Sequence, residues 1–256
     1  MVLTLTTDFG TRDGFVAQMK GVVLQINPSV RLIDVTHDIE PYSVLHAALV
    51  LKGISRYFPA GTIHIAVVDP GVGSDRRGMA LKAGDQLYVG PDNGLFSLVL
   101  AESSSWEARR IENTRYMLPN PHPTFHGRDV FAPVAAHLSA GKTLESVGTR
   151  IHDPVMVPVP SPVITEQGVE GEVIHIDRFG NLTTNIDAGM LSEPVASIRT
   201  AGVSISRVSQ YFDEACEGRP VALVNSFGLL EIAIARGNAS RKLGVAPGTR
   251  VTVAFA

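Results

Sequence analysis

The sequence predicts an α/β protein with two domains, an N-terminal α/β domain built on a parallel sheet and a smaller C-terminal β domain. Strand-like and helix-like patterns alternate over about the first 155 residues. Prolines then punctuate the stretch from 154 to 162, which favours an extended linker. Beyond it the helical period fades, and short β-like segments separated by turns favour a small barrel or a sandwich. The expected boundaries are 1–155 for the first domain, 154–164 for the linker and 165–256 for the second domain.

The N-terminal domain contains three short apolar segments that suit buried strands, at 2–6, 31–35 and 62–68. Apolar residues recur at helical spacing between them, over 15–26 and, from a cap at Ser43, through residue 57. Strands that alternate with helices indicate a parallel sheet, and such sheets bind ligands beyond the carboxyl ends of their strands.

Further along, the pattern predicts a hairpin at 79–82 and 86–89 and a helix at 129–140. The strands expected in the second domain are 169–176, 181–186, 196–200, 222–224, 229–233 and 250–255.

Composition excludes several classes of protein. Of 256 residues, 45% are hydrophobic and 18% are charged, which excludes a disordered chain. The net charge of -3 lacks the basic excess of a nucleic-acid-binding protein, so no nucleic-acid partner is expected. The single cysteine, Cys216, excludes a disulfide framework and every CxxC motif. No apolar stretch is long enough to span a membrane and no signal peptide precedes the first strand, so a cytoplasmic protein without membrane contact is expected.

Acidic residues follow each of the first three predicted strands. Asp8 follows the first strand, Asp34 and Asp38 flank the end of the second, and Asp69 follows the third. Asp8 is either a turn former or a carboxylate that binds ribose hydroxyls or a metal. Asp69 precedes Pro-Gly-x-Gly, which forms either an Asx turn or a loop that lets a ligand approach the backbone.

Cations and polar turns surround these acids in the sequence. Arg76 and Arg77 lie in the loop after Asp69, where an arginine beside the carboxylate would keep it ionised. His126, next to a glycine and followed by Arg128 and Asp129, is either a surface histidine or part of a binding loop at a helix start. The second domain contains two motifs, Asp177-Arg-Phe-Gly-Asn and Asn225-Ser-Phe-Gly, that are either simple turns or aromatic and amide groups for a purine.

Taken together, these motifs resemble a known family. The segments TTDFGTRDGFVAQMKG, IDVTHDI, FPAGTIHIAVVDPGVGSDRR, VGPDNGL, TFHGRDVFAPVAAHL, IDRFGNLTTNI and NSFGLLEIA occur in this order from Leu3 to about Ala239. They look like the S-adenosyl-L-methionine hydroxide adenosyltransferases, the hydrolytic relatives of fluorinase and chlorinase. P-loop, GxSxG, HExxH and GxGxxG motifs are absent.

The resemblance implies a β-barrel for the second domain and a homotrimer, with the ligand between one subunit's N-terminal domain and its neighbour's C-terminal domain. The implied reaction is attack of water on C5′ of the ribose of S-adenosyl-L-methionine, which gives adenosine and L-methionine. No cofactor and no metal are implied, because a sulfonium already carries a good leaving group.

The resemblance also implies the site residues. The family's water-binding triad falls on Asp69, Arg76 and His126, and spacing from Asp69 favours Arg76 over Arg77. Asp8 matches the position that binds ribose hydroxyls, Tyr42 an aromatic wall, and Asp177 the carboxylate that pairs with the methionine ammonium. The remaining expected substrate-binding residues are Val72, Phe125, Phe179, Asn181, Asn225, Ser226, Phe227, Glu231, Arg236 and Ala239.

Two departures from the halogenase pattern favour water over halide. The halogenases have no acid where Asp69 stands, and they carry a small hydroxyl residue where Gly127 follows His126. Two rival functions remain open on the sequence alone. Asp8, Asp38 and Asp69 with His37 and His126 would suit a divalent cation in a nucleotide phosphohydrolase. A non-catalytic protein that binds adenosine or S-adenosylmethionine is the other.

Overall fold

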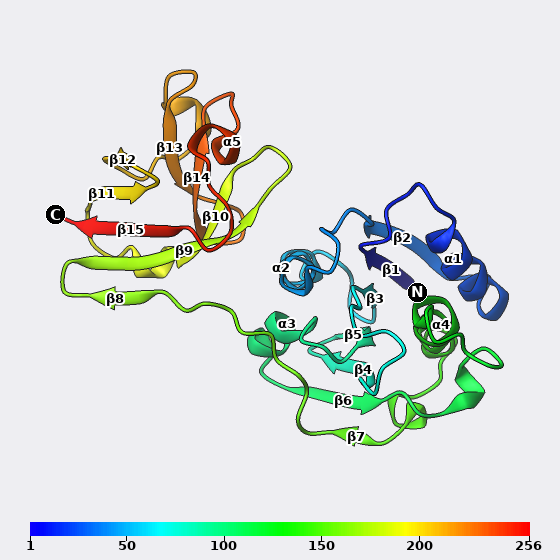
Figure 1. Ribbon diagram of the computed structural model, residues 1–256. Coiled ribbons are helices and arrows are strands. Elements are labelled where there is room, and N and C mark those ends of the chain that lie inside the picture. Colours follow the sequence, from blue (N-terminus) through cyan, green and yellow to red (C-terminus); the bar gives the residue numbers. More distant parts are fainter. The chain divides into compact units, whose positions relative to one another are not determined.

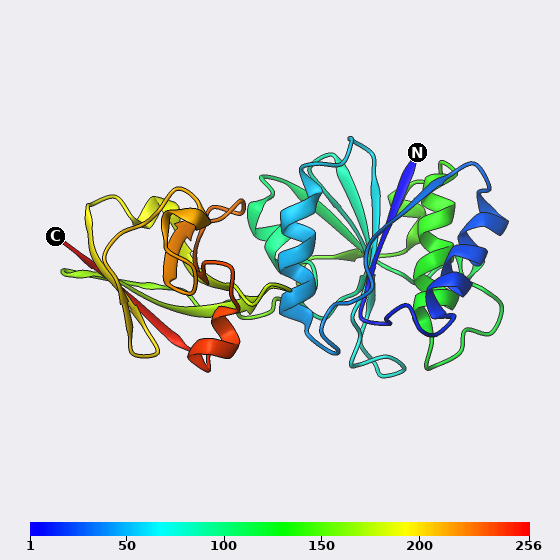
Figure 2. The same ribbon diagram turned by 90° about the horizontal axis from the view of Figure 1, so that it is seen from above.

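The computed structural model describes residues 1–256, which form two compact units, Met1–Pro158 and Val159–Ala256 (Figures 1 and 2). The helices of the first unit are α1 (Phe15–Ile26), α2 (Val44–Ser55), α3 (Ser97–Glu102) and α4 (Ala132–Ser139). Its strands are β1 (Val2–Thr7), β2 (Arg31–Thr36), β3 (Ile63–Val67), β4 (Gly78–Ala83), β5 (Gln86–Pro91), β6 (Trp106–Arg110) and β7 (Arg150–Ile151).

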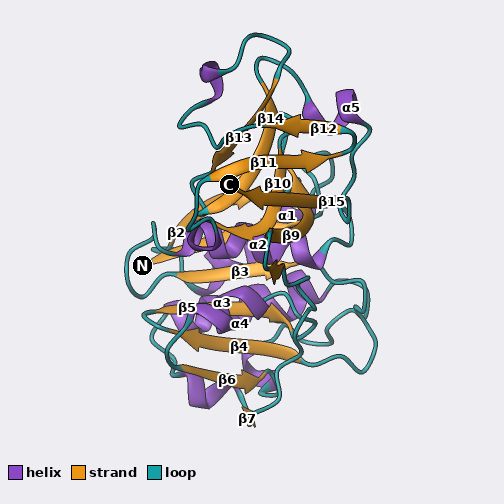
Figure 3. Ribbon diagram, turned by 90° about the vertical axis from the view of Figure 1, so that its left-hand side faces the viewer, coloured by secondary structure: helices purple, strands orange, loops and turns teal.

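The sheet of the first unit has the strand order β2-β1-β3-β5-β4-β6-β7. Strands β2, β1, β3 and β5 pair in parallel, which confirms the predicted parallel sheet. The hairpin β4–β5 then reverses the direction, and β6 and β7 extend the sheet by antiparallel pairing (Figure 3). The sequence pattern did not predict β6 or β7, because Glu107, Arg109 and Arg110 interrupt the apolar character of this part of the sheet.

Helices cover both faces of this sheet. On one face α1 and α4 pack over Leu3, Leu5 and Val67 of the central strands. On the other, α2 and α3 pack over Ala66, Leu81 and Tyr88 (Figure 1). The hydroxyl of Ser43 accepts a hydrogen bond from the amide of His46, so Ser43 caps α2 as expected. No helix of the chain has the length and apolar character needed to cross a membrane.

A buried polar cluster lies within the α2 face of the sheet. His64 of β3 is fully buried and stacks on Tyr88 of β5, with 5.0 Å between ring centroids. Its Nδ1 lies 2.8 Å from the Thr4 hydroxyl and its Nε2 lies 2.6 Å from Gln86 Oε1. Because Gln86 Nε2 donates to two backbone carbonyls, Gln86 Oε1 accepts, and the proton of His64 is on Nε2. Burial lowers the pKa of His64 to about 4, so the ring is neutral at pH 7.

We expect this histidine to make the first unit less stable in mild acid. The unfolded chain binds the proton below pH about 6.5 and the folded chain only below about 4, so stability falls through that window and then levels off. The difference in pKa corresponds to a loss of about 3 kcal/mol. Urea unfolding of the wild type and of His64→Gln at pH 7 and pH 4.5 checks this, with the exposed His152→Gln as the control. An equal pH dependence in the wild type and His64→Gln would contradict the expectation.

The segment predicted as a linker is hydrogen-bonded on both sides. The amide of Val155 donates to Asp92 Oδ1 and the amide of Val157 donates to the Ser97 hydroxyl, both within the first unit. Within the second unit, Asn185 Nδ2 donates to the carbonyl of Pro160. Each end of the stretch is thus hydrogen-bonded to the unit of which it is a part.

The second unit is a β structure that nearly closes into a barrel. Its strands are β8 (Val163–Thr165), β9 (Gly168–Ile176), β10 (Leu182–Asp187), β11 (Val195–Thr200), β12 (Val203–Ile205), β13 (Pro220–Val224), β14 (Leu229–Ile234) and β15 (Arg250–Phe255). All pair antiparallel in the order β12-β11-β15-β9-β10-β14-β13, with β8 on β9. A bridge between Ser209, after β12, and Leu223 of β13 brings the two ends of this order together. The single α-helix is α5 (Ala239–Leu243).

The barrel-like sheet confirms the expected β fold, and its inward side chains form one core. This core contains Val173, Leu182, Ile232 and Val251, which are fully buried. Bulges in β10 at Thr183 shift its register against both neighbours. Thr183 pairs with Glu231 of β14, and β10 begins just after the turn at Asp177. Bulges are frequent next to functional residues.

Candidate active site

A pocket of about 370 Å³ opens at the carboxyl ends of β1 and β3 in the first unit. This is where a parallel sheet is expected to bind its ligand. The lining residues are Asp8, Phe9, Phe15, Pro41, Tyr42, Val67, Asp69, Val72, Thr124, Phe125, His126 and Gly127. Six of these were expected from the sequence, namely Asp8, Tyr42, Asp69, Val72, Phe125 and His126.

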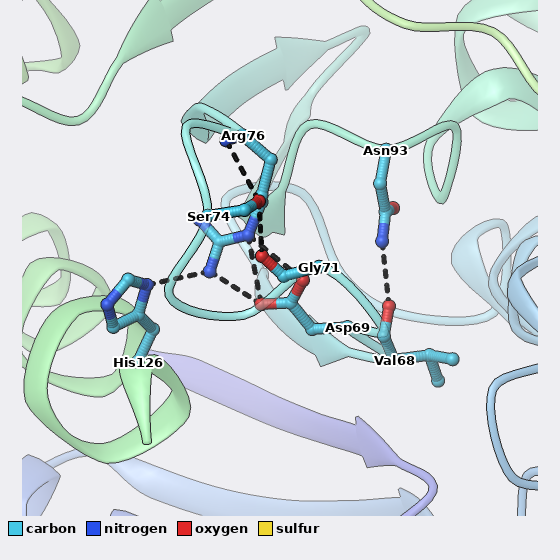
Figure 4. Close-up of polar contacts among 7 residues, drawn as sticks. All are labelled: Val68, Asp69, Gly71, Ser74, Arg76, Asn93 and His126. Carbon is cyan, nitrogen blue, oxygen red and sulfur yellow. Dashed lines mark hydrogen bonds and ion pairs between the residues drawn. The ribbon is translucent and has the colours of Figure 1, made fainter. Parts of the chain in front are cut away.

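Asp69, Arg76 and His126 form one hydrogen-bonded cluster (Figure 4). Arg76 Nε donates to Asp69 Oδ1 at 2.9 Å, and Arg76 Nη2 donates to Asp69 Oδ2 at 2.5 Å. The same Nη2 lies 2.7 Å from Nδ1 of His126. The guanidinium also stacks on Phe131, 5.2 Å from the ring centre. Only 5% of the Asp69 side chain and 11% of the Arg76 side chain are exposed, so the cluster is held largely out of bulk water.

The partners of His126 determine where its proton lies. An arginine guanidinium can only donate, so His126 Nδ1 must accept from Arg76 and a neutral imidazole carries its proton on Nε2. Burial and the positive charge of Arg76 lower the pKa of His126, against the opposing charges of Asp69 and Asp129. A neutral His126 with an Nε2–H group therefore lines the pocket beside the carboxylate of Asp69.

The loop after β3 is shaped to present this cluster. Asn93 Nδ2 donates to the carbonyl of Val68, and the Ser74 hydroxyl donates to the carbonyl of Gly71 (Figure 4). Gly73 has φ of +80°, and a Cβ here would lie 2.6 Å from the carbonyl oxygen of Pro123. Only glycine lets the loop pack this closely against the segment that leads to His126. His126 itself precedes a π-helical turn, Gly127–Phe131, a feature frequent at functional sites.

The second arginine of the loop has a different set of partners. Arg77 Nε donates to Asp92 Oδ2 at 2.8 Å, and its Nη1 donates to Asp153 Oδ1 at 2.8 Å. Arg77 does not contact Asp69, so the spacing argument selected the arginine that the structure brings to the carboxylate.

The interpretation that all three acidic strand ends contribute to one site was wrong for the second strand. Asp38 is exposed and does not line the pocket, and Asp34 is bonded to Lys20 and His37. The reason is the strand order: β2 is at the edge of the sheet, and the pocket lies between the ends of β1 and β3. No three His, Cys, Asp or Glu side chains are grouped to hold a metal ion, so the structure does not assemble the cation site of the phosphohydrolase hypothesis.

A larger pocket of about 880 Å³ lies on the second unit. Its lining residues are Asp177, Phe179, Asn181, Gln210, Tyr211, Phe212, Leu223, Val224, Asn225, Ser226, Phe227, Glu231, Ile234, Arg236 and Gly237. Every residue expected from the second domain is present except Ala239. Ala239 is fully buried in the barrel core, backbone included, so the structure does not place it at this pocket.

The two sequence motifs of this unit fold into two separate turns of the same type. Asp177 Oδ1 accepts from the amides of Phe179 and Asn181, and Asn225 Oδ1 accepts from the amides of Phe227 and Leu229. Each turn leaves its phenylalanine exposed at the pocket, by 72% for Phe179 and 49% for Phe227. In the first turn Gly180 has φ of +86°, and a Cβ there would collide with the side chain of Asn238. The motifs are therefore turns that present an aromatic ring.

Two carboxylates share this pocket. Asp177 is oriented by three hydrogen bonds, the third from Asn181 Nδ2 at 3.0 Å. Glu231 is buried and accepts from Asn225 Nδ2 at 3.1 Å. Burial raises the pKa of Glu231 and the charge of Asp177 adds to the shift, while the hydrogen bonds from Asn225 and Thr183 oppose it. A pocket that contains these two acids is suited to a cation such as an ammonium group.

Several lining residues were not expected from the sequence. Phe9 and Phe15 are two of these, and they pack edge to face with each other and with the expected Phe125 in the first pocket, with centroids 5.4–6.0 Å apart. Tyr211 and Phe212 line the second pocket and are both exposed. Two sequence signals were available. Phe9 directly follows Asp8, and Tyr211 and Phe212 form an aromatic pair within a polar loop. Arg236 lines the second pocket but is 68% exposed and lies 3.8 Å from Asp213, a loose contact.

Comparison with known proteins covers both units. Models of the SAM hydroxide adenosyltransferase N-terminal and C-terminal domains match residues 3–148 and 171–252. The chain is similar to (R)-S-adenosyl-L-methionine hydrolase of Salinispora tropica, at 39% identity over 98% of this chain and 97% of the relative. It is 31% identical to a fluorinase of an Actinoplanes species, over 98% and 97%. A solved structure of an uncharacterized conserved protein from Thermotoga maritima is 38% identical with a TM-score of 0.91, over 99% of this chain and 100% of that one.

Proposed function

The chain belongs to the SAM hydroxide adenosyltransferase family, and from this premise we propose how its residues catalyse hydrolysis of S-adenosyl-L-methionine. The protein is an S-adenosyl-L-methionine hydrolase. Water attacks C5′ of the ribose, the C5′–S bond breaks with its electron pair on sulfur, and adenosine, L-methionine and one proton result. The thioether leaves as a neutral group, so no acid is needed at sulfur and the task of the enzyme is to orient and deprotonate water.

The observation that carries the assignment of the water site is the Asp69–Arg76–His126 cluster at the first pocket. A water molecule there has a donor, His126 Nε2–H, and an acceptor, the carboxylate of Asp69. We infer that His126 donates to the water oxygen and that Asp69 takes the proton as the C–O bond forms. Arg76 donates to both partners and fixes their orientation. Positioning of this kind and general base catalysis together supply much of the rate in such reactions.

The second pocket suits the remaining parts of the substrate. Phe179 and Phe227 present ring faces on which the adenine can stack, and Asn181 and Asn225 offer amide groups at the same wall. We propose that Asp177 and Glu231 receive the ammonium group of the methionine moiety. Asp8 and Tyr42 of the first pocket are proposed to hold the ribose, with Val72 and Phe125 beside it. Among the remaining candidates, Ser226 and Arg236 line the second pocket, and the buried Ala239 is not assigned a contact with the substrate.

We propose that the enzyme is a homotrimer in which one subunit's first pocket and its neighbour's second pocket enclose one substrate. The support is chemical, since the water-activating groups and the ammonium-binding groups belong to different units. A cytoplasmic location is proposed because the single free cysteine, Cys216, suits a reducing compartment. We also propose that 154–164 links two independently folding domains.

Mixing two inactive variants tests the shared site. In an equimolar mixture of Asp69→Asn and Asp177→Ala chains assembled at random, about one site in four combines an intact half from each, so about a quarter of wild-type activity is expected. Activity is measured after co-refolding and compared with each variant alone. If the site lies within one chain, the mixture has no intact site and stays as inactive as its components.

The activity itself is tested by incubating the protein with S-adenosyl-L-methionine in chelator-treated buffer, with and without chloride, followed by chromatography. Adenosine and methionine in both, without a 5′-chloro product, are the expected result. No product at all would overturn the hydrolase assignment, and retained binding of the compound would then favour a binding protein. If no product forms, release of phosphate from nucleotides on addition of Mg²⁺ or Mn²⁺ would favour the phosphohydrolase.

A further inference from the structure

Four side chains that have no role in the proposed reaction form a series of polar contacts between α1 and the ends of β1 and β2. Lys20 Nζ of α1 lies 2.5 Å from Asp34 Oδ2, and Asp34 Oδ1 lies 3.0 Å from His37 Nε2. His37 Nδ1 lies 2.9 Å from the hydroxyl of Thr7, the last residue of β1. Thr7 is fully buried, and only 5% of the His37 side chain is exposed. Burial opposes the charge of Asp34, but the hydrogen bonds from Lys20 and His37 hold its pKa below the ordinary value.

The arrangement has the residue types of a nucleophilic triad, but it cannot act as one. The Thr7 hydroxyl has no exposed surface through which to reach a substrate. The carboxylate of Asp34 can only accept, so a neutral His37 carries its proton on Nε2, facing Asp34, and its Nδ1 accepts from the Thr7 hydroxyl. The oxygen of Thr7 also accepts from the amide of Phe9 at 3.3 Å. The chain of contacts therefore fixes positions and does not activate an oxygen.

What it fixes is the contact between the loops that follow β1 and β2. The amide of Gly10 donates to the carbonyl of His37 at 2.8 Å, and the amide of Ile39 donates to the carbonyl of Thr7 at 3.3 Å. The Thr7–His37 side-chain contact thus joins two loops that are also joined through the backbone of the same two residues.

Asp8 and Tyr42 lie on these two loops and both line the pocket. Asp8 Oδ2 accepts from the amide of Tyr42 at 3.0 Å. Tyr42 has φ of +68°, a conformation that a tyrosine adopts only where its surroundings enforce it. One oxygen of Asp8 therefore holds the aromatic residue in place, and the other oxygen remains for a ligand.

We propose that Thr7 and His37, anchored by Asp34 and Lys20, are positioning residues that set Asp8 and Tyr42 for the substrate's ribose diol. This proposal rests on the proposed function, because it assigns the diol to Asp8. It assigns no chemistry to His37 itself. Its consequence is that loss of the Thr7–His37 contact weakens the enzyme only through Asp8 and Tyr42.

The chain offers a matched control for the test. Thr4, on the same strand and fully buried, lies 2.8 Å from Nδ1 of a second buried histidine, His64, away from the pocket. Thr7→Val and Thr4→Val each remove one threonine–imidazole contact with little change of shape. Both are expected to lower the melting temperature. Only Thr7→Val is expected to reduce kcat/KM for S-adenosyl-L-methionine, by about tenfold. The loss is expected mainly in KM, because Thr7 is coupled to Asp8, a residue that binds the substrate.

The decisive step repeats Thr7→Val in an Asp8→Ala background. There the substitution is expected to change kcat/KM by less than about twofold, because the group it positions is gone. An undiminished tenfold loss in that background would overturn the proposal, as would equal kinetic losses in Thr7→Val and Thr4→Val. If Thr7→Val does not fold, Thr7→Ser, which keeps the hydroxyl, and His37→Gln replace it, with retained and reduced kcat/KM expected respectively.

Binding of adenosine, measured by calorimetry on the same variants, distinguishes failure of the proposed function from failure of the positioning role. A wild type that binds adenosine without hydrolysing S-adenosyl-L-methionine refutes the proposed function alone, and an increase of about tenfold in the adenosine Kd of Thr7→Val then still supports the positioning role. A wild type that neither binds adenosine nor hydrolyses S-adenosyl-L-methionine overturns both.

Discussion

Replacement of Asp69 by asparagine is expected to lower kcat by about 10²–10⁴-fold while KM changes little. The amide has nearly the shape of the carboxylate, so the pocket keeps its form, but it cannot take a proton from water. It also loses the charge-assisted hydrogen bonds from Arg76, which now hold both carboxylate oxygens. Since water is bound by this cluster and the substrate largely by other residues, the loss is expected in kcat.

Asp75→Asn is the matched control, because Asp75 lies in the same loop but is exposed. Single-turnover rates and equilibrium binding of substrate, measured for both variants, separate chemistry from affinity. Turnover of Asp69→Asn within about threefold of the wild type would remove Asp69 from the mechanism and leave His126 as the group that meets the water proton. A large rise in Kd without a change in the single-turnover rate would make Asp69 a binding residue.

The members of this cluster were predictable, but their division of labour was not. The motifs around residues 69, 76 and 126 identified the three residues, and their order along the chain fitted strand ends of a parallel sheet. The tautomer of His126 depends on which of its nitrogens meets Arg76, a contact between segments 50 residues apart. That geometry is set by the close packing of Gly73 on Pro123, for which the sequence offers only a glycine.

Strand order explains the main error of the sequence interpretation. Alternating patterns predicted β1, β2 and β3 correctly, yet they do not say that β1 lies inside the sheet, between β2 and β3, and that β2 is at the edge. Asp38 was therefore grouped with Asp8 and Asp69, although only the latter two share a pocket. In the second unit the opposite holds, because the turns at Asp177 and Asn225 are determined by local side-chain to backbone hydrogen bonds. Turns that depend on such local hydrogen bonds can be predicted without knowledge of the strand order.

Arg77→Met is expected to lower the stability of the first unit by about 3–5 kcal/mol, because it leaves the carboxylate of Asp92 buried without its cation. The Asp92 side chain has no exposed surface, and its other oxygen is occupied by the amide of Val155. At this chain length such a loss corresponds to a fall in melting temperature of about 10 °C or more. Calorimetry checks it, with Arg110→Met as the control, since Arg110 and Glu112 form an exposed pair worth less than about 1 kcal/mol.

The double variant Arg77→Met/Asp92→Asn tests the cause. An asparagine carries no charge and keeps an oxygen for the Val155 amide, so it is expected to recover much of the lost stability. A double variant no more stable than Arg77→Met would mean that packing of the arginine, and not the buried charge, is what the unit needs. The adjacent arginines then differ in a measurable way. Asp69→Asn removes the charged partner of Arg76 and is expected to lower turnover. Arg77→Met leaves Asp92 buried without a cation and is expected to lower stability. A loss of kcat at unchanged melting temperature in Arg77→Met would reverse that division.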